Sequence, residues 1–191
     1  MSSATADSMN EKLPTHADVA DEMALQWAVS QFLYQEAELL DDKDLNTWYE
    51  LLAEDISYLM PVQTNVYPGD VKHRTPEEAG YGGDYFADSK QGMGLRVRKA
   101  MSGRDHIERP ASKLRHLVTN VRVVATRGAE VDVRSSFVVH RFRHGEFQDL
   151  YVGRRDDVLR RADNAYGWEI AKRVITLDQT VLMGGGIGFF F

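Results

Sequence analysis

Cysteine is absent from the 191 residues of this chain. Disulfides, cysteine-ligated zinc, iron–sulfur clusters and thiol nucleophiles all require cysteine side chains, so this chain can hold none of them. Nothing in the sequence therefore asks for an oxidising compartment.

Long apolar runs are also missing. No stretch approaches the roughly 20 apolar residues that span a bilayer, and the N-terminus, with Asp7 and Glu11, lacks the apolar run of a signal peptide. We therefore expect a soluble, cytoplasmic protein. With 43% apolar and 10% aromatic residues, the chain has enough apolar material for the core of one domain.

The two halves of the chain have opposite charge balances. Residues 1–95 hold five basic and 18 acidic side chains, whereas residues 96–191 hold 18 basic and 11 acidic ones. Two interpretations are open: the halves face each other within one domain, or part of the arginine-rich surface contacts another subunit. Basic residues alternate with acidic ones instead of clustering with aromatics, which argues against a nucleic-acid surface.

The first half of the chain predicts helices. Residues 1–17 are small, polar and acidic, typical of a flexible tail, so we expect a single domain over residues 18–191. A helix begins near Asp18, because side chains on one side recur with a period of 3.6 residues over 25–40, Glu36 among them. Asp44 is placed to cap a second, short helix.

The middle of the chain has weaker patterns. Ile56 to Pro61 predicts a strand that ends at the proline. Residues 63–86 are punctuated by proline and glycine and predict a loop. A helix is expected from Ser89 to Met101, although its two internal glycines each cost roughly 1 kcal/mol.

The last third predicts four strands joined by turns, at 114–126, 130–143, 147–161 and 168–182. Short connections make such neighbours antiparallel. On the last strand, Trp168, Ile170 and Val174 alternate with Glu169 and Arg173. Helices followed by a long meander predict an α+β fold, with the helices packed on one face of a curved antiparallel sheet.

The sequence offers little for metal or nucleophilic chemistry. The six histidines are His16, His73, His106, His116, His140 and His144. Only His140 and His144 are four apart, and at a strand end they are separated by roughly 13 Å, which fits exposed hairpin residues better than one ion. A two-histidine, one-carboxylate iron site built from distant positions stays open. There is no serine elbow, and the glycines at 184–186 and 188 precede no helix that could bind phosphate.

Acid–base chemistry is the serious alternative. Curved-sheet α+β domains include dehydratases and isomerases that use a histidine, aspartate or tyrosine in the interior of the cone. The candidates here are Tyr58, Asp55, His116 and Asp178. Each also has an ordinary role available: a strand tyrosine with a bonded hydroxyl, helix-end carboxylates, and a histidine at a strand entrance.

The chain ends in three consecutive phenylalanines, Phe189, Phe190 and Phe191. Exposed rings there would promote aggregation, so we expect them to be buried, near a subunit boundary, with the preceding glycines letting the chain turn. Frayed, disordered rings are the alternative.

Several segments, in their order and spacing over about residues 25–182, resemble the small (β) subunits of aromatic-ring-hydroxylating dioxygenases. These segments are residues 34–42, followed by Trp48, then 51–61, 112–121, 151–160 and 168–178. The sequence of residues 151–160 and 168–178 is most similar to the toluene/biphenyl branch. Two departures are Lys113, where the family usually has arginine, and the glycine-rich stretch before the final phenylalanines.

The resemblance implies a cone-shaped α+β fold of the nuclear-transport-factor or scytalone-dehydratase type, in a hexamer of three large and three small subunits. The large subunit would hold a Rieske [2Fe–2S] cluster and a mononuclear iron. Supplied with electrons from NADH by a reductase, usually through a ferredoxin, it would insert both atoms of dioxygen into an arene to give a cis-dihydrodiol. The small subunit would be structural, with no catalytic, cofactor-binding or metal residue. A stand-alone cone-fold dehydratase or isomerase, or a small-ligand binding module, remains the alternative.

Overall fold

The computed structural model describes residues 16–62, 84–102, 111–143, 147–179 and 187–191. In chain order its elements are α1 (His16–Asp41), α2 (Leu45–Glu50), β1 (Leu52–Met60), β2 (Phe86–Asp88), α3 (Lys90–Met101), β3 (Lys113–Arg127), β4 (Glu130–Arg143), β5 (Phe147–Arg161) and β6 (Trp168–Leu177). Most of the expected flexible tail, of the loop over 63–86 and of the glycine run lies outside the described residues.

The helices begin where their capping residues predict. The Asp44 side chain accepts a hydrogen bond from the main-chain N–H of Thr47 at 3.2 Å, and Ser89 caps α3 in the same way. Such caps satisfy main-chain donors that have no partner within the helix. Among the described residues, no helix is both long and apolar enough to cross a bilayer.

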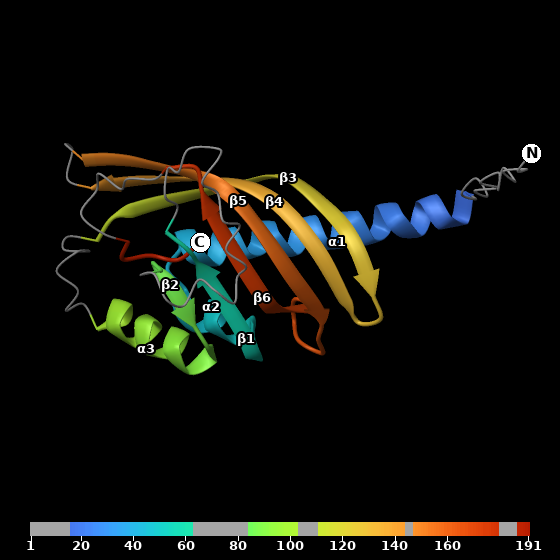
Figure 1. Cartoon of the computed structure of the whole chain (residues 1–191), viewed down its shortest axis with the longest axis horizontal. Helices are drawn as coiled ribbons and strands as arrows, with labels where there is room; N and C mark the ends of the chain where they lie inside the picture. Colours follow the sequence, from blue (N-terminus) through green and yellow to red (C-terminus); the bar gives the residue numbers. More distant parts are fainter. Residues whose placement is uncertain (1–15, 63–83, 103–110, 144–146, 180–186) are drawn as a thin grey trace, which may run out of the picture.

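The described strands form one curved sheet in the order β2-β1-β6-β5-β4-β3, with the helices on one face (Figure 1). The antiparallel meander of β3 to β6 and the α+β class are confirmed. The sheet is not wholly antiparallel, because β1 lies parallel to β6. The short β2 falls at the end of the predicted loop and pairs with β1.

Helix α1 packs against β3, the edge strand of the meander, and satisfies part of its open edge. The Gln26 side chain donates to the main-chain oxygen of Val121 at 2.9 Å and accepts from the N–H of Val123 at 3.0 Å. Asp41 accepts from the N–H of His116 at 2.9 Å. An unpaired strand edge would otherwise invite pairing with other chains.

One face assignment on β6 is wrong. Trp168 and Ile170 are buried as expected, but Arg173 is fully buried at 0% exposure and Val174 is only half-buried. The register between β5 and β6 shifts at Val158 and Leu159, which indicates a bulge. One extra residue in a strand moves every following side chain to the opposite face, so Arg173 faces the core.

Candidate functional site

The acid–base candidates separate into two groups. Tyr58 on β1 and His116 on β3 are buried and both contact the segment 187–191. Asp55 lies on the surface, where Arg160 binds both of its carboxylate oxygens, at 2.9 and 3.0 Å, and lowers its pKa. Asp178 is exposed just beyond β6. The structure therefore does not assemble the four candidates into one site.

The final phenylalanines fill the interior of the cone. Phe189, Phe190 and Phe191 are 5%, 4% and 1% exposed, so their predicted burial is confirmed. Their rings lie 5.1 Å from Tyr151, 4.6 Å from Trp48 and 5.4 Å from Phe137, respectively, measured between ring centroids. The segment thus packs against rings from α2, β4 and β5.

Buried side chains also bind the main chain of this segment. The Tyr58 hydroxyl donates to the main-chain oxygen of Phe191 at 2.8 Å and accepts from its N–H at 3.2 Å. Arg173 donates to the same oxygen at 2.7 Å. Burial raises the pKa of Tyr58 to about 12, so this hydroxyl stays protonated at neutral pH. Both bonding roles of the hydroxyl are used within the chain.

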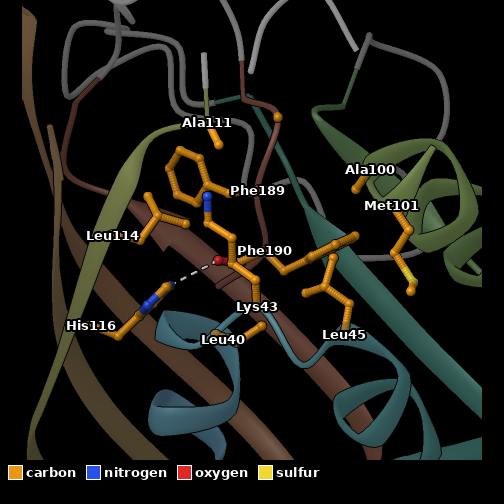
Figure 2. A pocket seen from close by; sticks show the side chains of 11 residues that line it. Leu40, Lys43, Leu45, Ala100, Met101, Ala111, Leu114, His116, Phe189 and Phe190 are labelled. Atoms are coloured by element: carbon orange, nitrogen blue, oxygen red, sulfur yellow. Dashed lines mark hydrogen bonds between the residues drawn. The ribbon is translucent and has the colours of Figure 1, made fainter. Parts of the chain in front are cut away.

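His116 is engaged on both ring nitrogens. Its Nδ1 lies 2.7 Å from an oxygen of Asp41, and its Nε2 lies 3.0 Å from the main-chain oxygen of Phe190 (Figure 2). Arg115 binds the other oxygen of Asp41 at 2.9 Å. The histidine therefore ties the C-terminal segment to the end of α1 and keeps no nitrogen for a substrate.

A buried charge cluster, centred on Glu36 of α1, lies beneath Phe191. Arg173 binds both oxygens of Glu36 and also both oxygens of Asp157, the latter at 2.8 and 3.0 Å. Trp48 donates from its indole nitrogen to Glu36 at 3.0 Å, and Arg155 donates to it at 3.3 Å. The helical pattern placed Glu36 on the apolar side of α1. Its partner Arg173 was not predicted, because the alternating pattern of its strand assigned Arg173 to the wrong face.

Electrostatics fixes the charges of this cluster. Burial alone would raise the pKa of Glu36, but Arg173, Arg155 and the hydrogen bonds outweigh it and lower that pKa from 4.5 to about 2. For Arg173, burial opposes the charge, yet Asp157 and Glu36 raise its pKa well above the usual value. For Arg155, burial and the neighbouring Arg173 lower the pKa. One nitrogen of Arg155, Nη2, has no hydrogen-bond partner among the described residues.

A cavity of about 250 Å³ lies beside the phenylalanines. It lies between the end of α1, the start of α2, the end of α3 and the start of β3 (Figure 2). Its lining is mostly apolar and comprises Leu40, Lys43, Leu45, Ala100, Met101, Ala111, Leu114, His116, Gly188, Phe189 and Phe190.

Metal-ligating side chains do not gather in the part of the chain that the structure describes: no three histidine, aspartate or glutamate residues there lie close enough to hold one ion. His140 is half-buried on β4. His144, its partner in spacing, lies outside the described residues.

Comparison with known proteins gives close relatives across most of the chain. The β subunit of biphenyl 2,3-dioxygenase from Rhodococcus jostii (strain RHA1) is 39% identical over 171 residues, 88% of this chain and 89% of that protein. The β subunit of benzene 1,2-dioxygenase from Pseudomonas putida is 39% identical over 176 residues, 92% of each chain.

Solved structures share the fold at lower identity. A naphthalene 1,2-dioxygenase with indole bound in its active site matches with a TM-score of 0.76 and 19% identity, covering 94% of this chain and 96% of that one. ActVI-ORFA from Streptomyces coelicolor matches with a TM-score of 0.56 and 15% identity, covering 84% and 99%. Residues 35–183 match the family described as ring hydroxylating beta subunit. This chain therefore belongs to that family, the β subunits of aromatic-ring-hydroxylating dioxygenases.

Proposed function

We propose that this chain is the non-catalytic, structural subunit of a terminal oxygenase, assembled with an iron-bearing α subunit as an α3β3 hexamer in the cytoplasm. Electrons from NADH would reach that α subunit through a reductase and a ferredoxin. The relatives act, by name, on biphenyl and benzene. The proposed reaction of the assembly is accordingly the insertion of dioxygen into a one- or two-ring arene to give a cis-dihydrodiol.

The main support for a non-catalytic role is that the chain's own side chains fill the interior of the cone. A cone-fold dehydratase or isomerase needs an interior open to substrate and a side chain free to move a proton. Here Phe191 occupies that interior, and Tyr58 and His116 both bind the segment that fills it. The arrangement supports a packed core and disfavours the enzyme alternative.

The donor chemistry supports placing the Rieske cluster on the partner subunit. A Rieske cluster needs two cysteine ligands beside its two histidines, and this sequence has no cysteine. The residues of this chain therefore do not fit a Rieske cluster.

The start of α1 supports assembly with other subunits. Residues 16–24 are exposed on every side, and this part of the helix runs past the ends of the strands (Figure 1). Val19, Met23 and Trp27, spaced by four, form an apolar stripe with exposures of 39%, 67% and 67%. A short helical stretch without packing is marginal in water, so a partner surface over this stripe would stabilise it.

The uncovered face of the sheet offers a second apolar surface. Leu117, Val138 and Val152 stand side by side across β3, β4 and β5. They point away from the helices, because Phe137 and Val139, the chain neighbours of Val138, face the core. Leu117 is 55% exposed, which suits an interface better than contact with water.

Co-expression with the cognate α subunit tests the assembly. We expect a particle of about six chains by light scattering, with iron in the complex and none in this chain alone. Trp27→Asp should reduce the hexamer yield at least about tenfold, because it buries a charge in the apolar stripe. Leu95→Asp is the matched control, since Leu95 is exposed to a similar extent, 59%, but lies on α3, away from that stripe.

Two results would contradict the proposal. Stoichiometric iron in the chain expressed alone would end the non-catalytic interpretation. A soluble monomer that does not bind the α subunit would contradict the proposed assembly.

A further inference from the structure

We propose that the open cavity at the end of the cone is a binding site for a small aromatic carboxylate, with Lys43 holding the carboxylate group. This site goes beyond the structural role proposed above and does not depend on it. The proposal rests on the volume and walls of the cavity, on its charge, and on the backbone conformation of Lys43.

The cavity has the size and walls that an aromatic ring requires. Its volume of about 250 Å³ exceeds the roughly 150 Å³ of an apolar protein cavity that binds benzene. The rings of Phe189 and Phe190 line it together with Leu40, Leu114 and the Met101 thioether. Ring edges, ring faces and sulfur all pack favourably against an aromatic ligand.

The polar groups of the cavity leave one cation for a ligand. His116 also lines the cavity, but Asp41 and the main-chain oxygen of Phe190 take both of its nitrogens. Lys43 is exposed to solvent, its ammonium has no hydrogen-bond or ion-pair partner among the described residues, and its side chain reaches toward Phe189 (Figure 2). A lone cation beside apolar walls favours an amphipathic anion over a neutral or cationic ligand.

The backbone conformation of Lys43 is strained, and the side chain makes no hydrogen bond or ion pair with the described residues that would offset this strain. Lys43 has a φ of +61°, in the left-handed region. It follows the end of α1, where the N–H of Asp44 donates to the oxygen of Leu39 at 2.9 Å. Glycine is the usual residue at this helix-ending position because other residues are strained there. A strained non-glycine residue at the wall of a cavity points to a use for its side chain.

Titration of the full chain with 3-phenylpropionate, followed by calorimetry and by the NMR signal of the Met101 methyl group, tests the site. We expect saturable binding at least threefold tighter than that of the neutral amide of the same acid, in keeping with a solvated ion pair. Lys43→Met should abolish this preference, and Lys43→Arg should keep it. Ala100→Phe, which fills the cavity from the end of α3, should abolish binding of both compounds.

Lys43→Gly separates a binding role from a structural one. Glycine relieves the left-handed strain, so the melting temperature of this variant should rise by about 2 °C while the preference for the acid is lost. A structural lysine would give a fall in melting temperature instead, and that result would overturn the proposal. So would the absence of saturable binding at about 10 mM ligand, a preference that survives in Lys43→Met, or binding that survives in Ala100→Phe.

Discussion

Replacing Phe191 with alanine is expected to lower the unfolding free energy of the chain by about 3–5 kcal/mol. Phe191 is the most deeply buried of the three terminal rings, at 1% exposure. Its ring contacts Phe137, Tyr151 and Phe189, so truncation would leave a cavity inside an aromatic cluster. For a chain of this length the melting temperature should fall by about 10 °C.

Deleting residues 189–191 should have a larger effect. It removes three buried rings and also the main-chain partners of Tyr58, Arg173 and His116. Buried polar groups left without partners add about 1–3 kcal/mol each. The sum approaches the 5–15 kcal/mol that stabilises an ordinary domain, so the deleted chain should be largely unfolded.

Denaturant unfolding of the chain measures both changes. Trp27→Ala is the matched control, because this large aromatic side chain is 67% exposed and its removal should change the free energy by less than about 0.5 kcal/mol in the isolated chain. If Phe191→Ala unfolds at the same denaturant concentration as the wild type, the C-terminal segment is not part of the core.

Local patterns predicted most of the secondary structure. The period of 3.6 residues over 25–40 and the cap at Asp44 placed the first two helices. The turns at Gly128 and Gly167, both with positive φ, separate strands whose limits match the expected ones to within one residue, except that β6 ends at Leu177, short of the predicted 182. These features depend on neighbours in sequence, and sequence displays them directly.

Pairings between distant segments were not predictable in the same way. The parallel contact of β1 with β6 joins Tyr58 to Arg173 across more than 100 residues. Strand β2 has three residues, too few for a periodic pattern. The bulge that turns Arg173 inward depends on its register with β5, and no local feature of the strand announces it.

The sequence predicted the features of the candidate site that depend on adjacent residues, and it missed the charge cluster, which forms from residues far apart in the chain. Three adjacent phenylalanines predict burial without reference to any other part of the chain, because exposed rings would promote aggregation. The charge cluster needs Glu36, Asp157, Arg155 and Arg173 together, from three elements. The one available signal was an acid on the apolar side of a helix, since carboxylates are rarely buried without a partner.

Replacing Glu36 with glutamine is expected to destabilise the chain by about 3–5 kcal/mol at neutral pH, because it leaves Arg155 and Arg173 buried with too little negative charge. Glutamine keeps the size of the side chain, so the loss reports charge rather than volume. Glu38→Gln is the matched control, since Glu38 lies on the exposed side of the same helix and its change should stay below about 0.5 kcal/mol.

The pH dependence of this difference gives the sharper test. The pKa of Glu36 is lowered on folding from 4.5 to about 2, so below 4.5 the unfolded chain binds a proton that the folded chain refuses. The stability that Glu36 contributes is therefore complete above pH 4.5 and is lost as the pH falls toward 2. At roughly 1.36 kcal/mol per pKa unit this amounts to about 3 kcal/mol.

Glu36→Gln lacks this titration, so the difference in unfolding free energy between wild type and variant should shrink steadily between pH 4.5 and pH 2. Urea unfolding at several pH values across that range measures it, with Glu38→Gln beside it to remove the effect of the other carboxylates. A difference that stays constant down to pH 2 would mean that Glu36 gives up its proton equally well in both states. The guanidiniums of Arg173 and Arg155 would then do no more than offset its burial.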